Sequence, residues 1–340
     1  METILFLSPT EAALSKNTLE ALAAAKQLAD SLGAPFFVGL WGDAPKAAAD
    51  SIASCGAAKF FIVSGVEFAQ ARYATDAAAA EALCRAAGAT IVIAPSGSRW
   101  NRISAGVAHR LAGRADSHVT GLTASEGSPA IARWYYRQRM EGILTRTQRP
   151  WLISVESGIA PAWQGVAGSA VVEDVACLPA GVRTTVTGIE SLAADQQTIR
   201  PDADLLFVTG AGWTKKQPDG QVKVAEAEKL ILGFLNLARA SLGSTKSLVD
   251  LHGEGQATLT FLTHMNQVGQ TGSTPRHAKG LSTCCHGEEP HTVGWRFIGE
   301  RRAISLDPNC GWARGKADVL YVADAFAVME KVNSLIAQKS

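Results

Sequence analysis

One stretch of the chain combines backbone freedom with polar side chains, at the spacing of a ligand-binding loop. Residues 266–272 read Asn-Gln-Val-Gly-Gln-Thr-Gly. The two glycines let the backbone turn through positive φ and bring N–H groups close to a flat or anionic ligand. Gln270 and Thr271 add donors that can point at ring heteroatoms. The pattern predicts a binding loop, and a plain polar turn is the alternative that these residues alone leave open.

The cysteines are the other side chains with chemistry to offer. The six are scattered, and the last three lie near each other in sequence: Cys55, Cys84, Cys177, Cys284, Cys285 and Cys310. Adjacent residues of an extended segment point to opposite sides, so Cys284 and Cys285 are poor candidates for one metal ion. We therefore expect reduced, mostly buried thiols and no metal site.

Charge and length limit the class of protein. The chain has 32 Lys and Arg against 31 Asp and Glu, which gives no global electrostatic case for nucleic acid or an anionic membrane as partner. Its 340 residues fit about two domains. Residues 1–7 carry an acidic residue and a short apolar run, unlike a signal peptide. No apolar run approaches the roughly 20 residues that span a bilayer. We expect a cytoplasmic protein without membrane insertion.

Strand-like and helix-like patterns alternate through the first part of the chain. Strands are expected at 4–8, 36–40, 59–64 and 90–94, and helices at 17–33, 45–54 and 75–87. Apolar strands separated by helices imply a parallel, doubly wound sheet. Loop 95–99 precedes a further helix at about 102–111. We favour an ordinary turn there, because no G-x-G-x-x-G or Walker lysine is present; an anion cradle is the alternative.

The middle of the chain changes to strand-like runs at 131–136 and 151–155. They flank four arginines, Arg137, Arg139, Arg146 and Arg149. Without interleaved aromatic residues, these indicate a solvated or partner-facing surface and not a nucleic-acid groove. Residues 157–201 are rich in Gly, Pro and Ala, which predicts a connector with one edge strand at 183–187.

A second α/β unit follows the connector. Strands are expected at 204–208, 247–249, 302–305 and 319–322, with helices at 224–240, closed by Gly243, and at 325–337. The ligand of such a unit should lie at the carboxyl ends of its strands. We therefore divide the chain into an N-terminal, partner-facing domain at 1–180, a linker at 181–201 and a C-terminal domain at 202–340.

These motifs resemble the alpha subunit of electron transfer flavoproteins over nearly the whole chain. Residues 267–272 match the family's flavin-loop motif at every position, and Gly287 and His291 match its G-I-S-G-A-I-Q-H turn. Residues 304–308 stand where the family has a strand ending in I-N-x-D-P. The family's final pair of Ala-Asp dipeptides and its first-domain segments also match, at 317–318, 323–324, 18–22, 119–122 and 149–150.

The resemblance implies two doubly wound domains, the second a flavodoxin-like or Rossmann-like domain that binds FAD. The implied cofactor-binding residues are Gly212, Thr245, Lys246, Gln267, Val268, Gly269, Gln270, Thr271, Gly272, His286, Gly287, His291, Ser305, Asp307 and Asp324. Thr271 would donate near flavin N5, and His291 near N1 and the C2 carbonyl, where charge accumulates on reduction. Lys246 stands where the family has an arginine over the ring.

The remaining positions depart further from the family. Asp324 would face the adenosine end, where Ser305 replaces an asparagine, and Gly212 stands in place of an arginine. Glu288 and Glu289 fall in the turn expected beside the pyrophosphate, which they would repel unless they face solvent.

The implied function is electron transfer without conversion of a small substrate. Such a subunit takes electrons from a dehydrogenase and passes them to a quinone reductase or another acceptor, in a heterodimer with a beta subunit that holds AMP. A divergent member with altered or lost flavin, acting in assembly or regulation, is the alternative. A nucleotide-binding hydrolase is disfavoured, because the chain has no phosphate motif and no paired nucleophile and base.

Overall fold

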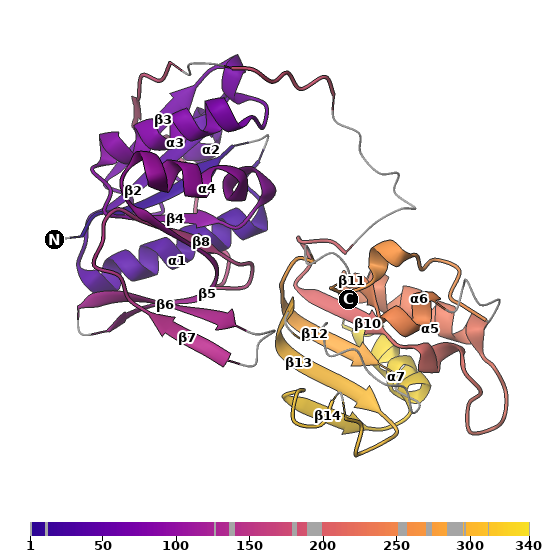
Figure 1. The fold of residues 1–340 in the computed structure, drawn as a ribbon. Helices are drawn as coiled ribbons and strands as arrows, with labels where there is room; N and C mark the ends of the chain where they lie inside the picture. The colour runs from indigo at the N-terminus through magenta and orange to yellow at the C-terminus, as the bar shows by residue number, and fades with distance from the viewer. Residues whose placement is uncertain are drawn as a thin grey trace. The chain divides into compact units, whose positions relative to one another are not determined.

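The fold comes from a computed structural model of the chain. It describes residues 2–10, 13–125, 127–135, 140–178, 182–188, 199–250, 257–269, 274–283, 295, 297–311 and 313–339. The chain divides into two compact units, Met1–Ile189 and Glu190–Ser340 (Figure 1). This division falls inside the connector expected from the sequence, and the finer boundaries with a linker at 181–201 stay a prediction.

Unit 1 is built on a nine-stranded mixed sheet with the order β7-β6-β5-β8-β4-β1-β2-β3-β9. Its strands are β1 (Ile4–Pro9), β2 (Phe36–Gly42), β3 (Lys59–Ser64), β4 (Ile91–Pro95), β5 (Arg114–Ser125), β6 (Ser128–Tyr135), β7 (Met140–Leu144), β8 (Trp151–Val155) and β9 (Val172–Asp174). Its helices are α1 (Lys16–Leu32), α2 (Pro45–Ser51), α3 (Tyr73–Ala87) and α4 (Ser98–Arg110), with the short η1 (Val66–Phe68). Pairing is parallel except for β5 with β6 and β6 with β7.

Helices cover both faces of this sheet. Successive residues of a strand point to opposite faces, so each central strand contributes side chains to two cores. In β1, Ile4 and Phe6 are fully buried in the core that α1 and α2 complete. Leu5 and Leu7 are fully buried in the other core, with α3 and α4. The doubly wound arrangement predicted from the alternating pattern is confirmed.

Unit 2 has a five-stranded, all-parallel sheet with the order β11-β10-β12-β13-β14. Its strands are β10 (Leu205–Thr209), β11 (Ser241–Ser244), β12 (His277–Thr283), β13 (Ile298–Ser305) and β14 (Val319–Val322). Its helices are α5 (Val224–Ala238), α6 (Lys246–Asp250) and α7 (Ala325–Ala337), with the short η3 (Ala211–Thr214) and η5 (His264–Asn266). Counted along the chain, the strand order is 2-1-3-4-5, that of flavodoxin-like folds.

The two faces of the second sheet carry separate cores. Phe207 and Ile304 pack against α5 and α7, which contact each other. On the opposite face, Leu206 and Val208 pack with Val268 of the predicted binding loop. The fold class, α/β with two sheets, is confirmed. Within the described residues, no helix combines the length and apolar character needed to cross a bilayer.

Several expected elements are wrong in place or kind. The strand expected at 247–249 belongs to α6, and the strand of that region is β11. Gly243 does not close a helix, because α5 ends at Ala238 and its C-cap is Arg239, with a left-handed φ of 50°. Residues 182–188 form no strand, and β9 takes the edge position beside β3.

Helix α1 begins at Lys16, one residue before the expected start. Ser15 is its N-cap, with the Ser15 hydroxyl accepting a bond from the Thr18 N–H at 3.3 Å. The side chain of Asn17 instead donates to the Ser96 carbonyl at 2.9 Å. It thereby joins the start of α1 to the loop after β4.

Candidate functional site

The predicted site residues that the structure describes lie at the carboxyl edge of the second sheet. Gly212 follows β10, and Thr245 and Lys246 follow β11. Ser305 ends β13, and Asp324 follows β14. Because all five strands are parallel, their carboxyl ends lie at one edge. β11 and β12 lie on opposite sides of β10, so the chain connections diverge there, and ligands of open α/β sheets bind at such a switch point.

The first half of the predicted binding loop is anchored on the edge strand β11. Gln267 forms a parallel bridge with Ser244, and the Val268 N–H donates to the Ser244 carbonyl at 3.0 Å. The Val268 side chain is 7% exposed and packs in the apolar core with Leu206. Gly243 leaves the room for it, since a Cβ there would lie 2.6 Å from Val268 Cγ2.

Gly269 turns the loop away from the strand. Its φ of 84° is in the left-handed region that favours glycine, as the sequence pattern predicted. Its N–H donates to Thr274 Oγ1 at 2.8 Å, which joins the two ends of the loop. Six predicted site residues lie outside the described residues: Gln270, Thr271, Gly272, His286, Gly287 and His291.

Thr245 places a buried hydroxyl at this edge. Its N–H donates to the Thr209 carbonyl at 2.9 Å, which holds it between the ends of β10 and β11. Its Oγ1 is buried and has no hydrogen-bond partner among the described residues. An unsatisfied buried hydroxyl costs about 1–3 kcal/mol. Its partner therefore lies outside the described residues, in a ligand, in solvent or in the rest of the chain.

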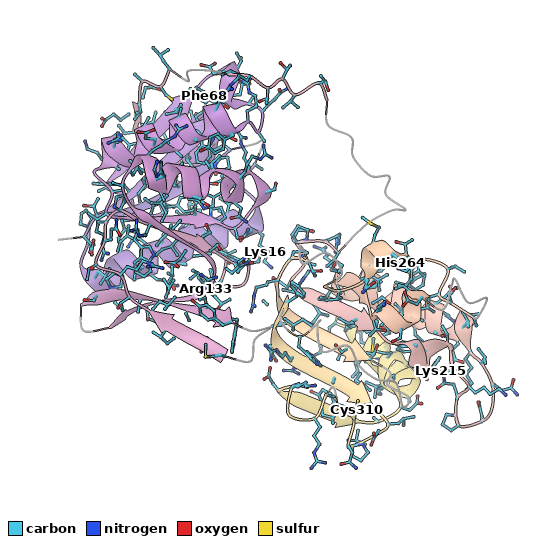
Figure 2. The ribbon with its side chains drawn as sticks, in the orientation of Figure 1. Lys16, Phe68, Arg133, Lys215, His264 and Cys310 are labelled. Carbon is cyan, nitrogen blue, oxygen red and sulfur yellow. The ribbon has the colours of Figure 1, made fainter. Side chains whose placement is uncertain are left out.

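Lys246 carries a positive charge to the start of α6. Its Nζ lies 3.7 Å from Asp250 Oδ2, and Asp250 Oδ1 lies 4.0 Å from His264 Nδ1. The Lys246 side chain is 54% exposed, so water screens both contacts. The position of His264 is shown in Figure 2. The chain therefore offers a weakly held cation beside Thr245.

The acidic and hydroxyl residues at β13 and β14 serve local turns. Ser305, 1% exposed, accepts a bond from the Asp307 N–H at 3.2 Å. Asp307 is exposed and accepts from the Asn309 N–H at 2.8 Å. Asp324 caps α7 by accepting from the Ala327 N–H at 2.9 Å. These contacts fix the loops, and the predicted adenosine-side role of Asp324 stays a prediction.

Sequence reasoning missed two residues that shape this edge. Trp213 is fully buried, and its Nε1–H donates to Thr283 Oγ1 at 2.8 Å. Thr283, the last residue of β12, donates in turn to the Val208 carbonyl at 3.2 Å. This chain of bonds ties the loop after β10 to β12. In the sequence, these bonds are visible only as a threonine at the end of a strand. That residue cannot be assigned a role until its hydrogen-bond partner is known.

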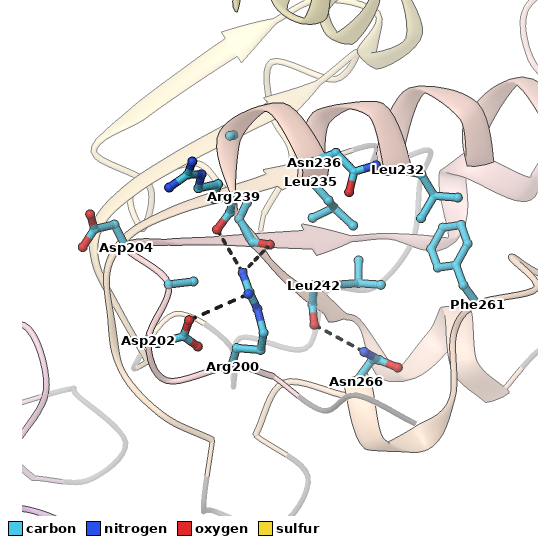
Figure 3. A pocket seen from close by; sticks show the side chains of 13 residues that line it. Arg200, Asp202, Asp204, Leu232, Leu235, Asn236, Arg239, Leu242, Phe261 and Asn266 are labelled. Carbon is cyan, nitrogen blue, oxygen red and sulfur yellow. Dashed lines mark hydrogen bonds and ion pairs between the residues drawn. The ribbon is translucent and has the colours of Figure 1, made fainter. Parts of the chain in front are cut away.

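A cavity of about 810 Å³ lies toward the opposite end of β10 and β11 (Figure 3). It is lined by Arg200, Asp202, Ala203, Asp204, Leu232, Leu235, Asn236, Ala238, Arg239, Ala240, Leu242, Phe261 and Asn266. Arg200 is engaged there, donating to the Arg239 carbonyl at 3.0 Å and lying 3.7 Å from Asp202. Among the described residues, the lining includes none of the predicted site residues; Asn266, next to Gln267, comes nearest in sequence.

In unit 1, the charged side chain of the 95–99 loop, Arg99, is already paired within the protein. Arg99 Nε donates to Asp76 Oδ2 at 3.0 Å, and Asp76 also accepts from Trp41 Nε1 at 2.9 Å. Asp76 is fully buried, and Arg99 is 8% exposed. Because a buried pair of this kind is strongly held once formed, Arg99 is not available to an anion. This favours the ordinary turn over the anion cradle.

Two of the four arginines in the middle of the chain pair with carboxylates. Arg146 donates to Asp116 Oδ1 at 2.9 Å, and Arg149 donates to Glu2 Oε1 at 2.9 Å. Arg133, labelled in Figure 2, lies 3.6 Å from Asp116. Arg146 and Arg149 thus help to hold unit 1 together. Arg137 and Arg139 lie outside the described residues.

These contacts shift two acidic pKa values. The hydrogen bond from Arg149 lowers the pKa of Glu2. Burial raises the pKa of Asp116, but the hydrogen bonds from Arg146 and Trp151 outweigh it, and the net shift is downward.

The described cysteines are free thiols and mostly buried, as expected. Cys55, Cys84 and Cys310 are buried and Cys177 is partly buried, and burial raises the pKa of Cys84 to about 12. In the part of the chain that the structure describes, no three His, Cys, Asp or Glu residues are grouped to hold a metal ion. Cys284 and Cys285 lie outside that part.

Comparison with known proteins identifies the family. A family model for the electron transfer flavoprotein domain matches residues 5–179, just over half of the 340 residues. The chain belongs to the electron transfer flavoprotein family. Comparison with curated proteins gives no match. Members of the electron transfer flavoprotein family typically bind FAD.

The candidate site lies outside the residues that the family model matches, because that range ends at residue 179. Its residues nevertheless suit a flavin. The Thr245 hydroxyl, which has no partner in the described part of the chain, the left-handed Gly269 and the cation of Lys246 lie at one sheet edge. They offer a hydrogen-bonding group, close backbone approach and positive charge, which a phosphate-bearing redox cofactor needs.

Proposed function

We propose that the chain is the alpha subunit of an electron transfer flavoprotein and carries FAD at the carboxyl edge of the unit 2 sheet. It accepts electrons from a dehydrogenase and passes them to a quinone reductase or another acceptor. The observation that carries the proposal is the motif loop. Its first residues are fixed to the end of β11, beside β10, whose other neighbour β12 marks the switch point, and Thr245 there has a buried hydroxyl without a partner among the described residues.

The residues of the chain have separate tasks at this site. FAD, when bound, supplies the electron-transfer chemistry. Thr271 donates to the ring near N5, His291 donates near N1 and the C2 carbonyl, and Lys246 adds positive charge where negative charge develops. Thr245 hydrogen-bonds the cofactor, and Gln267, Val268 and Gly269 hold the loop. These roles follow from the resemblance of the motif, supported by the geometry of the described residues.

Further positions complete the proposed site. Gln270, Gly272, His286 and Gly287 belong to the ring-side and phosphate-side turns. Gly212 lines the site after β10, and Ser305, Asp307 and Asp324 line it after β13 and β14. The flavodoxin-like strand order of unit 2 supports a nucleotide at this edge.

The partner of the chain is a beta subunit that holds AMP, and the two form a cytoplasmic heterodimer. Family membership supports a subunit partner and a dehydrogenase donor. No nucleic acid or membrane takes part. The near-neutral charge of the chain, 32 basic against 31 acidic residues, agrees with this choice of partners.

Ring-side variants test the proposal. The chain is co-purified with its beta partner, and the flavin content of wild type is compared with that of Thr271→Ala and His291→Ala. We expect flavin in wild type, and altered spectra or slower reduction in both variants. Thr260→Val, an exposed position in the same unit, is the matched control. Spectra and reduction kinetics unchanged in both ring-side variants would refute the assigned roles.

A divergent member without flavin is the second candidate. It is favoured by the end of the family match at residue 179, before unit 2, and by Gly212 in place of an arginine. Under this alternative the chain acts in assembly or regulation. It predicts that the complexes of wild type and of both ring-side variants are colourless. Their subunits should still associate, which size-exclusion chromatography measures.

A further inference from the structure

We propose that the cavity at the amino ends of β10 and β11 binds a small carboxylate with an apolar body. This site is separate from the proposed flavin site, which lies at the opposite, carboxyl edge of the same sheet. The residues that line the cavity all belong to the part of the chain that the structure describes. Its volume of about 810 Å³ is within the range of pockets that hold small organic molecules, roughly 300–1,000 Å³. The inference does not depend on the proposed function.

One part of the cavity wall is apolar. It is formed by Leu232 and Leu235 of α5, Leu242 of β11, and Phe261. Figure 3 shows these side chains in a different part of the lining from the charged ones. Leu232 is 43% exposed, and the other three residues are partly buried. A ligand whose apolar body covers these side chains removes their surface from water, which favours binding.

The other part of the wall is charged, and most of its charges are engaged within the protein. Arg200 donates to the carbonyls of Arg239 and Ala240 at 3.0 and 3.4 Å. It also lies 3.7 Å from Asp202, and Asp204 is engaged within the protein as well. Arg200 therefore satisfies carbonyls at the end of α5 and has little capacity left for a ligand.

The guanidinium of Arg239 is the charge that remains. Arg239 is exposed at the rim of the cavity, and its side chain has no hydrogen-bond or ion-pair partner among the described residues. Its φ of 50° and ψ of 33° are left-handed, a conformation in which glycine is the usual residue at a helix end. A side chain in this conformation carries strain, and such strain is frequent at functional positions.

The two parts of the wall together define the class of ligand. A monocarboxylate can place its charge beside Arg239, in contact with water, while its apolar body covers the leucines and Phe261. An exposed cation and a partly exposed apolar wall each contribute modestly, so we expect a dissociation constant in the millimolar range. Octanoate is a suitable probe. Octanamide has the same chain length and no charge, and is its matched control.

Isothermal titration calorimetry of the purified full-length protein measures the affinity of both probes. Wild type should bind octanoate about fivefold more tightly than octanamide, the effect of one exposed ion pair. Arg239→Gln should weaken octanoate binding about fivefold and leave octanamide binding unchanged. Lys229→Gln removes an exposed cation of α5 that does not line the cavity, and it should change neither affinity. Circular dichroism confirms that each variant is folded.

Leu232→Gln tests the apolar part of the wall. The leucine is partly exposed on α5, so the helix should tolerate the change, and both probes should bind about threefold to fivefold more weakly. An octanoate affinity that is unchanged in either Arg239→Gln or Leu232→Gln would overturn the inference. So would a wild-type protein without saturable octanoate binding at millimolar concentrations. Equal losses of octanoate and octanamide binding in Arg239→Gln would show that Arg239 does not pair with the carboxylate, and would overturn it too.

Discussion

Gly243→Ala tests whether the first part of the motif loop, residues 267–269, is fixed to β11 by close packing. A Cβ at Gly243 would lie 2.6 Å from Val268 Cγ2 and 3.1 Å from Leu206 Cδ1. The first distance is about 1 Å shorter than an ordinary carbon–carbon contact. Val268 cannot easily rotate away, because a β-branched side chain has few χ1 rotamers. We expect the substitution to lower the free energy of unfolding by about 1–3 kcal/mol.

A double-mutant cycle assigns this cost to the named contact. Val268→Ala alone should cost about 2 kcal/mol, from two buried carbons and the space they leave. In Gly243→Ala/Val268→Ala, the new methyl occupies that space. The double variant should therefore be more stable than the sum of the single effects by about 1–2 kcal/mol.

Urea denaturation followed by circular dichroism measures the four free energies. Gly311→Ala is the matched control, because a Cβ there meets nothing within 4 Å, and it should change stability by less than about 0.5 kcal/mol. Single effects that add to within about 0.5 kcal/mol would refute the packing argument. So would a Gly243→Ala variant as stable as wild type.

Three further predictions test other parts of the account. Asp116→Asn should destabilise unit 1 by about 3 kcal/mol near neutral pH. The pKa of Asp116 is lowered in the folded state. Its contribution to the free energy of unfolding is therefore fully present above the ordinary pKa of about 3.9 and is lost as the pH falls through the lowered pKa. A stability difference between wild type and variant that does not shrink in acid would contradict this. His277→Phe should lower the free energy of unfolding, measured by urea denaturation, by about 2 kcal/mol. The His277 residue is 2% exposed, and its ring nitrogens lie 2.8 Å from the Arg200 carbonyl and 3.1 Å from the Pro275 carbonyl. A loss below about 0.5 kcal/mol would argue against those bonds. If FAD binds as proposed, Lys246→Ala should make the two-electron midpoint potential of the flavin about 5–20 mV more negative. The shift is small because the Lys246 side chain is half exposed. A redox titration that shows a shift to more positive values would exclude the assigned role.

The first domain could be predicted well from sequence because its signals are local. Alternating apolar strands and Ala-rich helices specify a sheet covered on both faces, and β1 bears this out. β9 could not be found, because Val172–Asp174 is a short strand with two exposed acidic residues. Its pairing with β3 is decided by the tertiary fold. Edge strands of this kind leave no periodic pattern.

In the second domain the errors come from one glycine. Gly243 suggested the end of a helix, and the apolar pair Leu248 and Val249 then suggested the strand. In the structure Gly243 is part of the strand, where the absence of a side chain admits Val268. Such a role depends on a partner from far along the chain. Local propensity cannot reveal it.

The sequence marked a candidate site, but not the contacts that support it. The loop motif marked residues 267–272, and the structure fixes the described part of it to β11 at the edge of the sheet. The burial of the Thr245 hydroxyl, which has no partner among the described residues, and the bond from Asn266 to the Leu242 carbonyl depend on contacts between segments distant in sequence. Residues with these side chains occur in many ordinary turns, so only the fold distinguishes them.

The absorption spectrum of the co-purified heterodimer, followed by identification of the released nucleotides, tests the central claim most directly. The account predicts a yellow complex whose flavin bands disappear from the protein on denaturation, with FAD and AMP in the released fraction. A well-folded heterodimer that stays colourless after reconstitution with excess FAD would contradict it.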